Sequence, residues 1–148
     1  MEEWYGKHAS ALVRFAATVV GPTDAEDVVA AAVLSLLRSP ARPDDLRGYA
    51  YRAVLHEGRK HWRALDRRRR REALSARVVR HEDAEYVPEV ARSLSMLSPQ
   101  QRAAVHLTYW EDLTPGQVAV RLGVSDGTVR RQLARARRRL AEVLDDER

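Results

Sequence analysis

The sequence predicts an all-α protein made of two small helical domains joined by a linker. Apolar residues recur at spacings of three and four along most of the chain, and no stretch alternates apolar and polar residues as a half-buried strand does. A run of arginines after position 65 divides the two sets of helical patterns. We therefore expect one helical domain at 1–65, a charged linker at 66–87, and a four-helix domain containing a helix-turn-helix at 88–148.

Three helices are expected in the first domain. The first apolar pattern runs over 4–20 and stops at a glycine and a proline. The second helix, over 24–38, follows a capping box in which Thr23 and Glu26 would satisfy backbone N–H groups. The third runs from about 44 to 65 after a proline-rich break. The first domain is thus interpreted as three amphipathic helices in sequence.

Four helices are expected in the second domain, beginning with a short one over 88–97. Ser98 and Gln101 can form a capping box, with Pro99 at the first helical position. This box opens a helix that should reach about Trp110. The last two helices form the helix-turn-helix.

The segment 114–140 is the most informative motif. Thr114 and Gln117 can form a capping box at the start of its first helix. Gly123 then suits a left-handed turn, and Ser125 can cap the second helix. A short helix, a glycine turn and an arginine-rich second helix predict a helix-turn-helix that binds DNA.

The register of this second helix separates a core side from a basic side. The apolar residues at helical spacing, which should face the core, are Val129, Leu133, Ala136 and Leu140. An arginine stripe next to small residues is then turned outward, which suits the major groove. The predicted contacts with duplex DNA are Ser125, Thr128, Arg130, Arg131, Arg135 and Arg138.

Composition limits the classes of function. The chain has 26 lysines and arginines against 21 aspartates and glutamates, and every basic residue except Lys7 and Lys60 is arginine. Arginine favours bidentate contacts with phosphate and guanine. The absence of cysteine excludes disulfides, cysteine zinc sites and thiol catalysis. No run of about 18 apolar residues and no signal-peptide pattern is present, so a soluble, cytoplasmic protein with no membrane segment is expected.

Catalysis is not expected. The five histidines are scattered, and His56 and His61 lie too far apart around a helix to form a good ligand pair. A magnesium-dependent nuclease would need more than Asp24, Glu26 and Asp27, because no histidine, lysine or glycine-rich phosphate loop stands at a suggestive spacing. The sequence therefore predicts no enzymatic activity, no metal, no cofactor and no small-molecule substrate.

Three segments resemble the bacterial RNA polymerase sigma factors of the extracytoplasmic-function (ECF) group. LSPQQRAAVHLTYWEDLTPGQVAVRLGVSDGTVRRQLARARRRL, at 97–140, is similar to region 4 of that family. DAEDVVAAAVLSLLR, at 24–38, resembles the region 2 segment that docks on the clamp helices of polymerase. LRGYAYRAVLHEGRKHWR, at 46–63, resembles the segment that reads the minus-ten element.

The resemblance implies a factor that directs the RNA polymerase core to promoters for transcription initiation. The N-terminal domain would read the minus-ten element and the C-terminal helix-turn-helix the minus-thirty-five element. The implied partners are the clamp helices and flap of core polymerase, promoter DNA and an anti-sigma factor. We expect the arginine run Arg67–Arg71 to act electrostatically on phosphates, because five adjacent like charges repel each other until a polyanion binds.

Aromatic residues interleaved with cations support the minus-ten assignment. Tyr49, Tyr51 and Trp62 could stack on unstacked bases, and the cations between them could hold phosphates. The alternative is that Tyr49 and Trp62 are core residues and the cations form a solvated face. The N-terminal DNA contacts that we predict are Arg47, Tyr49, Tyr51, Arg52, His56, Arg59, Lys60 and Arg63.

The second expected helix carries the predicted polymerase surface. Residues three to four apart share one side of a helix, and here they are Asp24, Asp27, Val28, Ala31 and Ser35. The family usually has a glutamine and an acidic residue where this chain has Ala30-Ala31, so the interface is altered. The main alternative function is a stand-alone helix-turn-helix regulator that does not engage polymerase.

Overall fold

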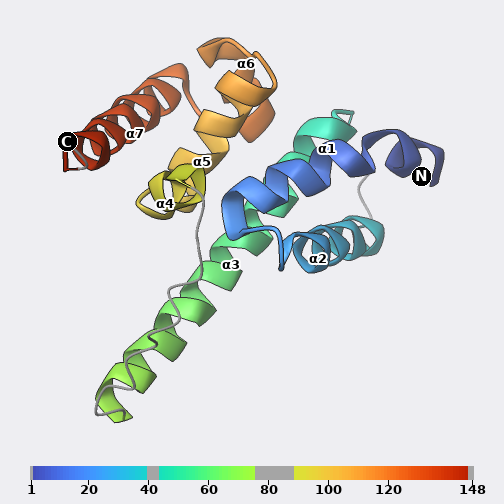
Figure 1. The fold of residues 1–148 in the computed structure, drawn as a ribbon. Coiled ribbons are helices and arrows are strands. Elements are labelled where there is room, and N and C mark those ends of the chain that lie inside the picture. Colours follow the sequence, from blue (N-terminus) through green and yellow to red (C-terminus); the bar gives the residue numbers. More distant parts are fainter. Residues whose placement is uncertain (1, 40–43, 76–88, 147–148) are drawn as a thin grey trace.

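The computed structural model describes residues 2–39, 44–75 and 89–146, and these form helices without any strand (Figure 1). The N-terminal half contains three helices and the C-terminal half contains four, with a π-helical turn after the second of those four. The elements in chain order are α1 (Glu2–Val20), α2 (Ala25–Arg38), α3 (Leu46–Ser75), α4 (Glu89–Ser95), α5 (Pro99–Val105), η1 (His106–Trp110), α6 (Pro115–Leu122) and α7 (Asp126–Asp146).

The first three helices pack around a small apolar core. Leu12, Phe15 and Val19 of α1 are at most 1% exposed, because they recur on one face of the helix. Gly58 lies where α3 comes closest to α1, since a β-carbon there would stand 2.8 Å from Cγ1 of Val19. A glycine inside a helix costs roughly 1 kcal/mol relative to alanine. Here the missing side chain permits the close approach of the two helices.

The capping box predicted at the start of α2 is wrong. Asp24 is the N-cap residue, and its side chain makes no capping hydrogen bond. Its carboxylate instead lies 3.1 Å from Nε2 of His61 on α3. A tertiary contact has therefore replaced the local cap that Thr23 and Glu26 were expected to provide.

Helix α3 begins at a capping residue one position later than expected and ends ten residues later. The backbone N–H of Gly48 donates to Oδ1 of Asp45 at 3.0 Å, so Asp45 caps the helix. The C-terminal end reaches Ser75 because arginine, glutamate, alanine and leucine are good helix formers and no glycine or proline intervenes. The linker predicted at 66–87 therefore starts as helix, and the rest of it lies outside the described residues.

The predicted caps and turn of the C-terminal half are confirmed. At α5, Gln101 N donates to Ser98 Oγ at 3.2 Å, and Ser98 N donates to Oε1 of Gln101 at 3.1 Å. At α6 the reciprocal pair joins Thr114 and Gln117, at 3.2 and 2.9 Å. Gly123 ends α6 with φ of 67°, in the left-handed region where glycine has no steric penalty. These local bonds fix both ends of the first helix of the helix-turn-helix.

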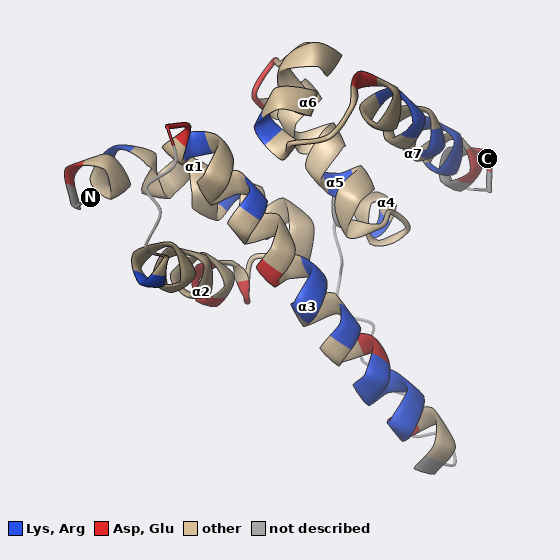
Figure 2. Cartoon of the chain, turned by 180° about the vertical axis from the view of Figure 1, so that it is seen from behind, with Lys and Arg blue, Asp and Glu red and all other residues tan. Residues whose placement is uncertain are grey.

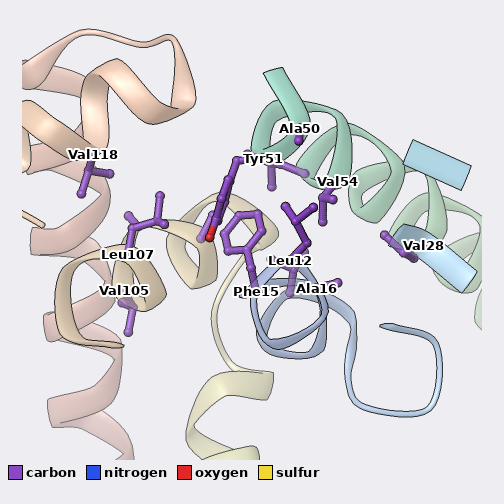
Figure 3. Packing of buried hydrophobic residues seen from close by; sticks show 14 of the residues in the cluster. Leu12, Phe15, Ala16, Val28, Ala50, Tyr51, Val54, Val105, Leu107 and Val118 are labelled. Atoms are coloured by element: carbon purple, nitrogen blue, oxygen red, sulfur yellow. The ribbon is translucent and has the colours of Figure 1, made fainter. Parts of the chain in front are cut away.

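One apolar core runs through both halves of the molecule. Its members come from α1, α2 and α3 and, on the other side, from α5, η1, α6 and α7. Phe15 lies at the junction, with its ring centroid 4.8 Å from that of Tyr51 (Figure 3). Leu107 and Val118 continue the cluster into the C-terminal half. The two halves are thus packed together, mainly through contacts of α1 and α3 with α5 and of α3 with α6.

Candidate nucleic-acid interface

Helix α7 is anchored at its N-terminus by its own side chains. The Thr128 backbone N–H donates to Oγ of Ser125 at 3.1 Å, which confirms the predicted cap. The two hydroxyl groups of Ser125 and Thr128 lie 2.9 Å apart, and Nη2 of Arg131 donates to the Thr128 hydroxyl at 3.2 Å. The residues proposed to stand near the DNA backbone therefore already form a small hydrogen-bonded group.

The register predicted for α7 is confirmed. Val129, Leu133 and Ala136 are at most 3% exposed and face α5 and α6, while Leu140 is half-buried. The opposite side carries the exposed arginines, and Figure 2 shows the basic colour along that helix. Within the described part of the chain, no carboxylate is paired with any of these outward side chains, which are Arg130, Arg131, Arg135 and Arg138.

Helix α3 offers a second basic surface, and part of it is accessible. Arg47, His56, Lys60 and Arg63 are exposed, and Tyr49 is half-buried. Lys60 pairs with Glu57 at 3.3 Å in the next turn, which is a surface contact of little energetic weight. These side chains can meet a nucleic acid in this conformation.

Tyr51 is buried, contrary to the expectation that its ring would be available for a base. It is 2% exposed, and its hydroxyl donates to Oε1 of Glu111 at 2.5 Å. Arg121 of α6 lies 5.0 Å above the same ring and 3.6 Å from the Glu111 carboxylate. Burial, and then the bond to Glu111, raise the pKa of Tyr51 well above its ordinary value, so the hydroxyl remains a donor. This residue joins the two halves.

Arg52 is also engaged with the C-terminal half. Its Nη1 donates to the carbonyl oxygens of Val120 and Arg121, at 3.5 and 3.3 Å. These carbonyls end α6, where the helix dipole favours a cation. The Arg52 side chain also lies over the turn, because a β-carbon on Gly123 would stand 2.9 Å from its Cδ. A predicted phosphate contact therefore caps the first helix of the helix-turn-helix.

Arg59 and Trp62 face α5. With its amide oxygen turned toward α3, Gln100 accepts from Nε and Nη2 of Arg59 at 3.1 and 2.6 Å. The Trp62 indole donates to the Val19 carbonyl at 2.9 Å, and Arg102 lies 4.4 Å above its ring. The alternative in which Trp62 is a packing residue is therefore favoured in this conformation.

The predicted polymerase surface on α2 is only partly exposed. Val28 is 6% exposed and belongs to the core, so its expected place on the surface is wrong. Asp24 and Ala31 are half-buried, whereas Asp27 and Ser35 are exposed. The register that buries Val28, with the core members of α2 at 25, 28, 29, 32 and 36, leaves a different side of the helix outward.

An apolar stripe on that outward side of α2 was not predicted from the sequence. Leu34 and Leu37 are 47% and 57% exposed, and Ala30 is exposed on the same side. Positions 30, 34 and 37 share a helical face, and that spacing was the signal that could have found them. Exposed leucines at helical spacing are suited to a partner helix.

The helices provide neither a cluster of metal ligands nor a membrane span in the ranges that the structure describes. Over 2–39, 44–75 and 89–146, no group of three or more His, Asp or Glu side chains is placed to hold a metal ion. None of the helices in those ranges is long and apolar enough to span a bilayer.

The fold and its surfaces define a helix-turn-helix DNA-binding protein with a second, helical half that carries its own basic and aromatic surface. Comparison with protein families agrees with this division: residues 4–69 match "Sigma-70 region 2" and residues 89–140 match "Sigma-70, region 4". The chain belongs to the ECF group of RNA polymerase sigma factors, as the resemblance predicted.

Curated relatives match nearly the whole chain. An RNA polymerase sigma-E factor of Streptomyces avermitilis is 31% identical, over 97% of this chain and 84% of the relative. The ECF RNA polymerase sigma factor SigL of Mycobacterium tuberculosis is 30% identical, over 99% of this chain and 89% of the relative.

Solved structures share the fold. The sigma factor RpoE of Bartonella quintana, solved with the anti-sigma factor NepR, aligns with a TM-score of 0.61 and 23% identity over the whole of both chains. CnrH, solved with the cytosolic domain of CnrY, aligns with a TM-score of 0.64 and 24% identity over 99% of this chain and 88% of its own. At these identities the likeness concerns the fold alone.

Proposed function

We propose that this protein directs the RNA polymerase core to specific promoters and reads two DNA elements with two helices. The observation that carries the proposal is the register of α7, whose exposed arginines stand opposite a buried face on a capped helix. A helix held in this way suits the major groove. The C-terminal domain, 88–148, contacts the minus-thirty-five element through Ser125, Thr128, Arg130, Arg131, Arg135 and Arg138.

The N-terminal domain, 1–65, reads the minus-ten element through α3. The accessible residues Arg47, Tyr49, His56, Lys60 and Arg63 can meet DNA directly. The remaining candidates on this helix are held by hydrogen bonds to the C-terminal half, so they join the interface only when the halves separate; these are Tyr51, Arg52 and Arg59.

Helix α2 is the proposed docking surface for the clamp helices of polymerase, while the C-terminal domain meets the flap. Asp27 and Ser35 remain in this interface, and the exposed Leu34 and Leu37 supply apolar area beside them. The acids attract a basic partner in a way that weakens as salt rises. The two structural neighbours were solved with anti-sigma proteins, which supports an anti-sigma partner for this chain as well. We place this activity in the cytoplasm and assign the chain no catalysis of its own.

A run-off transcription assay with core polymerase and the promoter of the protein's own operon tests this function. We expect promoter-specific transcripts and co-purification with the core. Asp27→Lys should weaken core binding while leaving DNA binding by the C-terminal half intact, and Glu3→Lys on exposed α1 is the matched charge control. If core polymerase does not bind the unmodified protein even at low salt, the stand-alone regulator becomes the better account.

The arginine run Arg67–Arg71, in the proposed linker 66–87, is assigned a sequence-independent role. All five side chains are exposed on the outer part of α3, where Figure 2 shows the basic colour concentrated. Replacing all five with alanine should lower DNA affinity evenly across sequences, and the salt slope should fall by about 0.9 for each phosphate that the protein no longer neutralises. A changed sequence preference would contradict this assignment.

A further inference from the structure

A cationic cavity lies between α3 and α5, where the two halves of the molecule meet. Its volume is about 550 Å³, and its arginines are Arg59, Arg63 and Arg69 from α3 and Arg102 from α5. We call this the arginine cavity. Among the described residues that line it, Asp66 is the one carboxylate, and it pairs with Arg70, which does not line the cavity, at 3.3 Å. Positive charge is therefore gathered here without matching negative charge.

The three arginines of α3 converge because of their spacing. Positions 59, 63 and 69 fall on one side of the helix, together with Trp62 and Asp66. Like charges four residues apart repel each other. Burial, and then the charge of Arg63, lower the pKa of Arg59. Within the described part of the chain, neither Arg63 nor Arg69 has a hydrogen-bond acceptor or a carboxylate partner.

Arg102 adds a nearly buried cation from the other half. It is 8% exposed, and its guanidinium donates to two carbonyl oxygens, those of Leu97 at 3.2 Å and Val19 at 3.0 Å. Burial lowers its pKa to about 10, so it stays charged at neutral pH. No carboxylate among the described residues pairs with it. A buried charge without an opposite charge is costly, and an anion would offset that cost.

We infer that the arginine cavity binds a compact polyanion with two or more linked phosphate groups. Guanidinium groups match phosphate oxygens bidentately, and four of them around one space can share several oxygens. The ligand bridges α3 and α5, so it stabilises the arrangement in which the halves are packed together. It also competes with promoter DNA for Arg59 and Arg63, which belong to the proposed minus-ten surface. The inference goes beyond promoter recognition and needs no polymerase for its test.

Calorimetry on the full chain tests the site, with sodium pyrophosphate and tripolyphosphate as probes and sulfate at equal ionic strength as the control anion. We expect saturable pyrophosphate binding and a rise in Tm that follows its concentration. Arg63→Gln and Arg69→Gln should each weaken binding by about tenfold. Arg68→Gln removes the same charge from the opposite side of α3, outside the cavity, and should change affinity by less than about twofold.

The outcomes separate the cavity from its rivals. Equal weakening by Arg68→Gln, sulfate binding as tightly as pyrophosphate, or no saturable binding would overturn the inference. Binding that appears only after Glu82, Asp83 and Glu85 are neutralised would also overturn it, because the cluster would then serve the chain's own acids. Tighter binding of ATP than of tripolyphosphate would identify a nucleotide as the ligand, and equal binding an inorganic polyphosphate; both results support the site.

Discussion

Helices α7 and α3 both carry arginines at helical spacing, yet they use them differently. On α7 the arginines proposed to read DNA are exposed, and that helix is anchored by Ser125 at its own N-terminus. On α3, Arg52 and Arg59 reach across to α6 and α5, and Tyr51 reaches Glu111. A recognition helix can thus be defined by its own register. The role of a side chain at the junction of two halves depends on residues far away in the sequence.

The largest expected effect breaks the α7 side of this comparison. Arg130→Ala and Arg131→Ala should each cost about 1–3 kcal/mol of promoter binding, and specificity should relax at each base position that the missing side chain would read. Unfolding free energy should change by less than about 0.5 kcal/mol, because both side chains are exposed. Fluorescence anisotropy with promoter and scrambled duplexes measures the change.

Arg137→Ala is the matched control on the same helix. Its Nε donates to the Tyr109 hydroxyl at 3.1 Å, so it is directed toward the protein. It should leave sequence preference unchanged. If Arg130→Ala and Arg131→Ala both bind the promoter as the parent does, the placement of α7 in the groove is wrong.

The next effect tests the α3 side. Tyr51→Phe removes the hydrogen bond to Glu111, and we expect a loss of about 1–3 kcal/mol in unfolding free energy, because bonds to charged acceptors are the stronger class. Tyr49→Phe on the same helix is the control, expected within about 0.5 kcal/mol of the parent. Urea unfolding measures both, and equal losses would show that the Tyr51 bond carries no special weight.

A third substitution probes the point where the two regions touch. Gly123→Ala should destabilise the protein by about 1–2 kcal/mol, because a β-carbon is disfavoured in the left-handed region. The new carbon would also crowd Arg52, so part of the loss should be relieved in an Arg52→Ala background. Gly127→Ala, inside α7 and clear of neighbours, should instead be neutral or stabilising. Thermal unfolding of the double-mutant cycle would contradict this if the two losses were additive.

The smallest expected effect is a dependence on pH from His106. This ring is 3% exposed, lies 2.8 Å from the Thr18 hydroxyl, and has its pKa lowered by burial. The unfolded chain therefore binds a proton more readily than the folded one, and stability falls as pH decreases below about 6.5. His106→Gln should flatten that slope between pH 7 and 5, whereas exposed His56→Gln should not. An unchanged slope in His106→Gln would remove this histidine as the cause.

The parts that the sequence predicted well are those decided within a turn of helix. The capping boxes at Ser98 and Thr114 each join residues three apart, and the turn at Gly123 needs only its own backbone. The box at Thr23 failed because Asp24 meets His61 on another helix. The Tyr51 bond spans 60 positions, so no local pattern could reveal it.

The candidate site divides in the same way. The outward arginines of α7 followed from the period of Val129 and Leu133, whereas the place of Val28 required knowing which side of α2 faces α3. The extent of α3 was missed for another reason. Charge suggested a linker after Asp66, but arginine is a good helix former and the helix continues to Ser75.

The unbroken course of α3 gives the molecule a built-in ruler. One continuous helix carries Arg52 near its buried end and Arg69 in its exposed part, which Figure 1 shows extending away from the other helices. At 1.5 Å per residue the two positions are separated by about 26 Å along the axis. That length corresponds to roughly seven to eight steps of a DNA strand at 3.4 Å each. A strand held at both points must therefore span this fixed interval, and inserting or deleting a turn of helix between them would shift the spacing by about 5.4 Å.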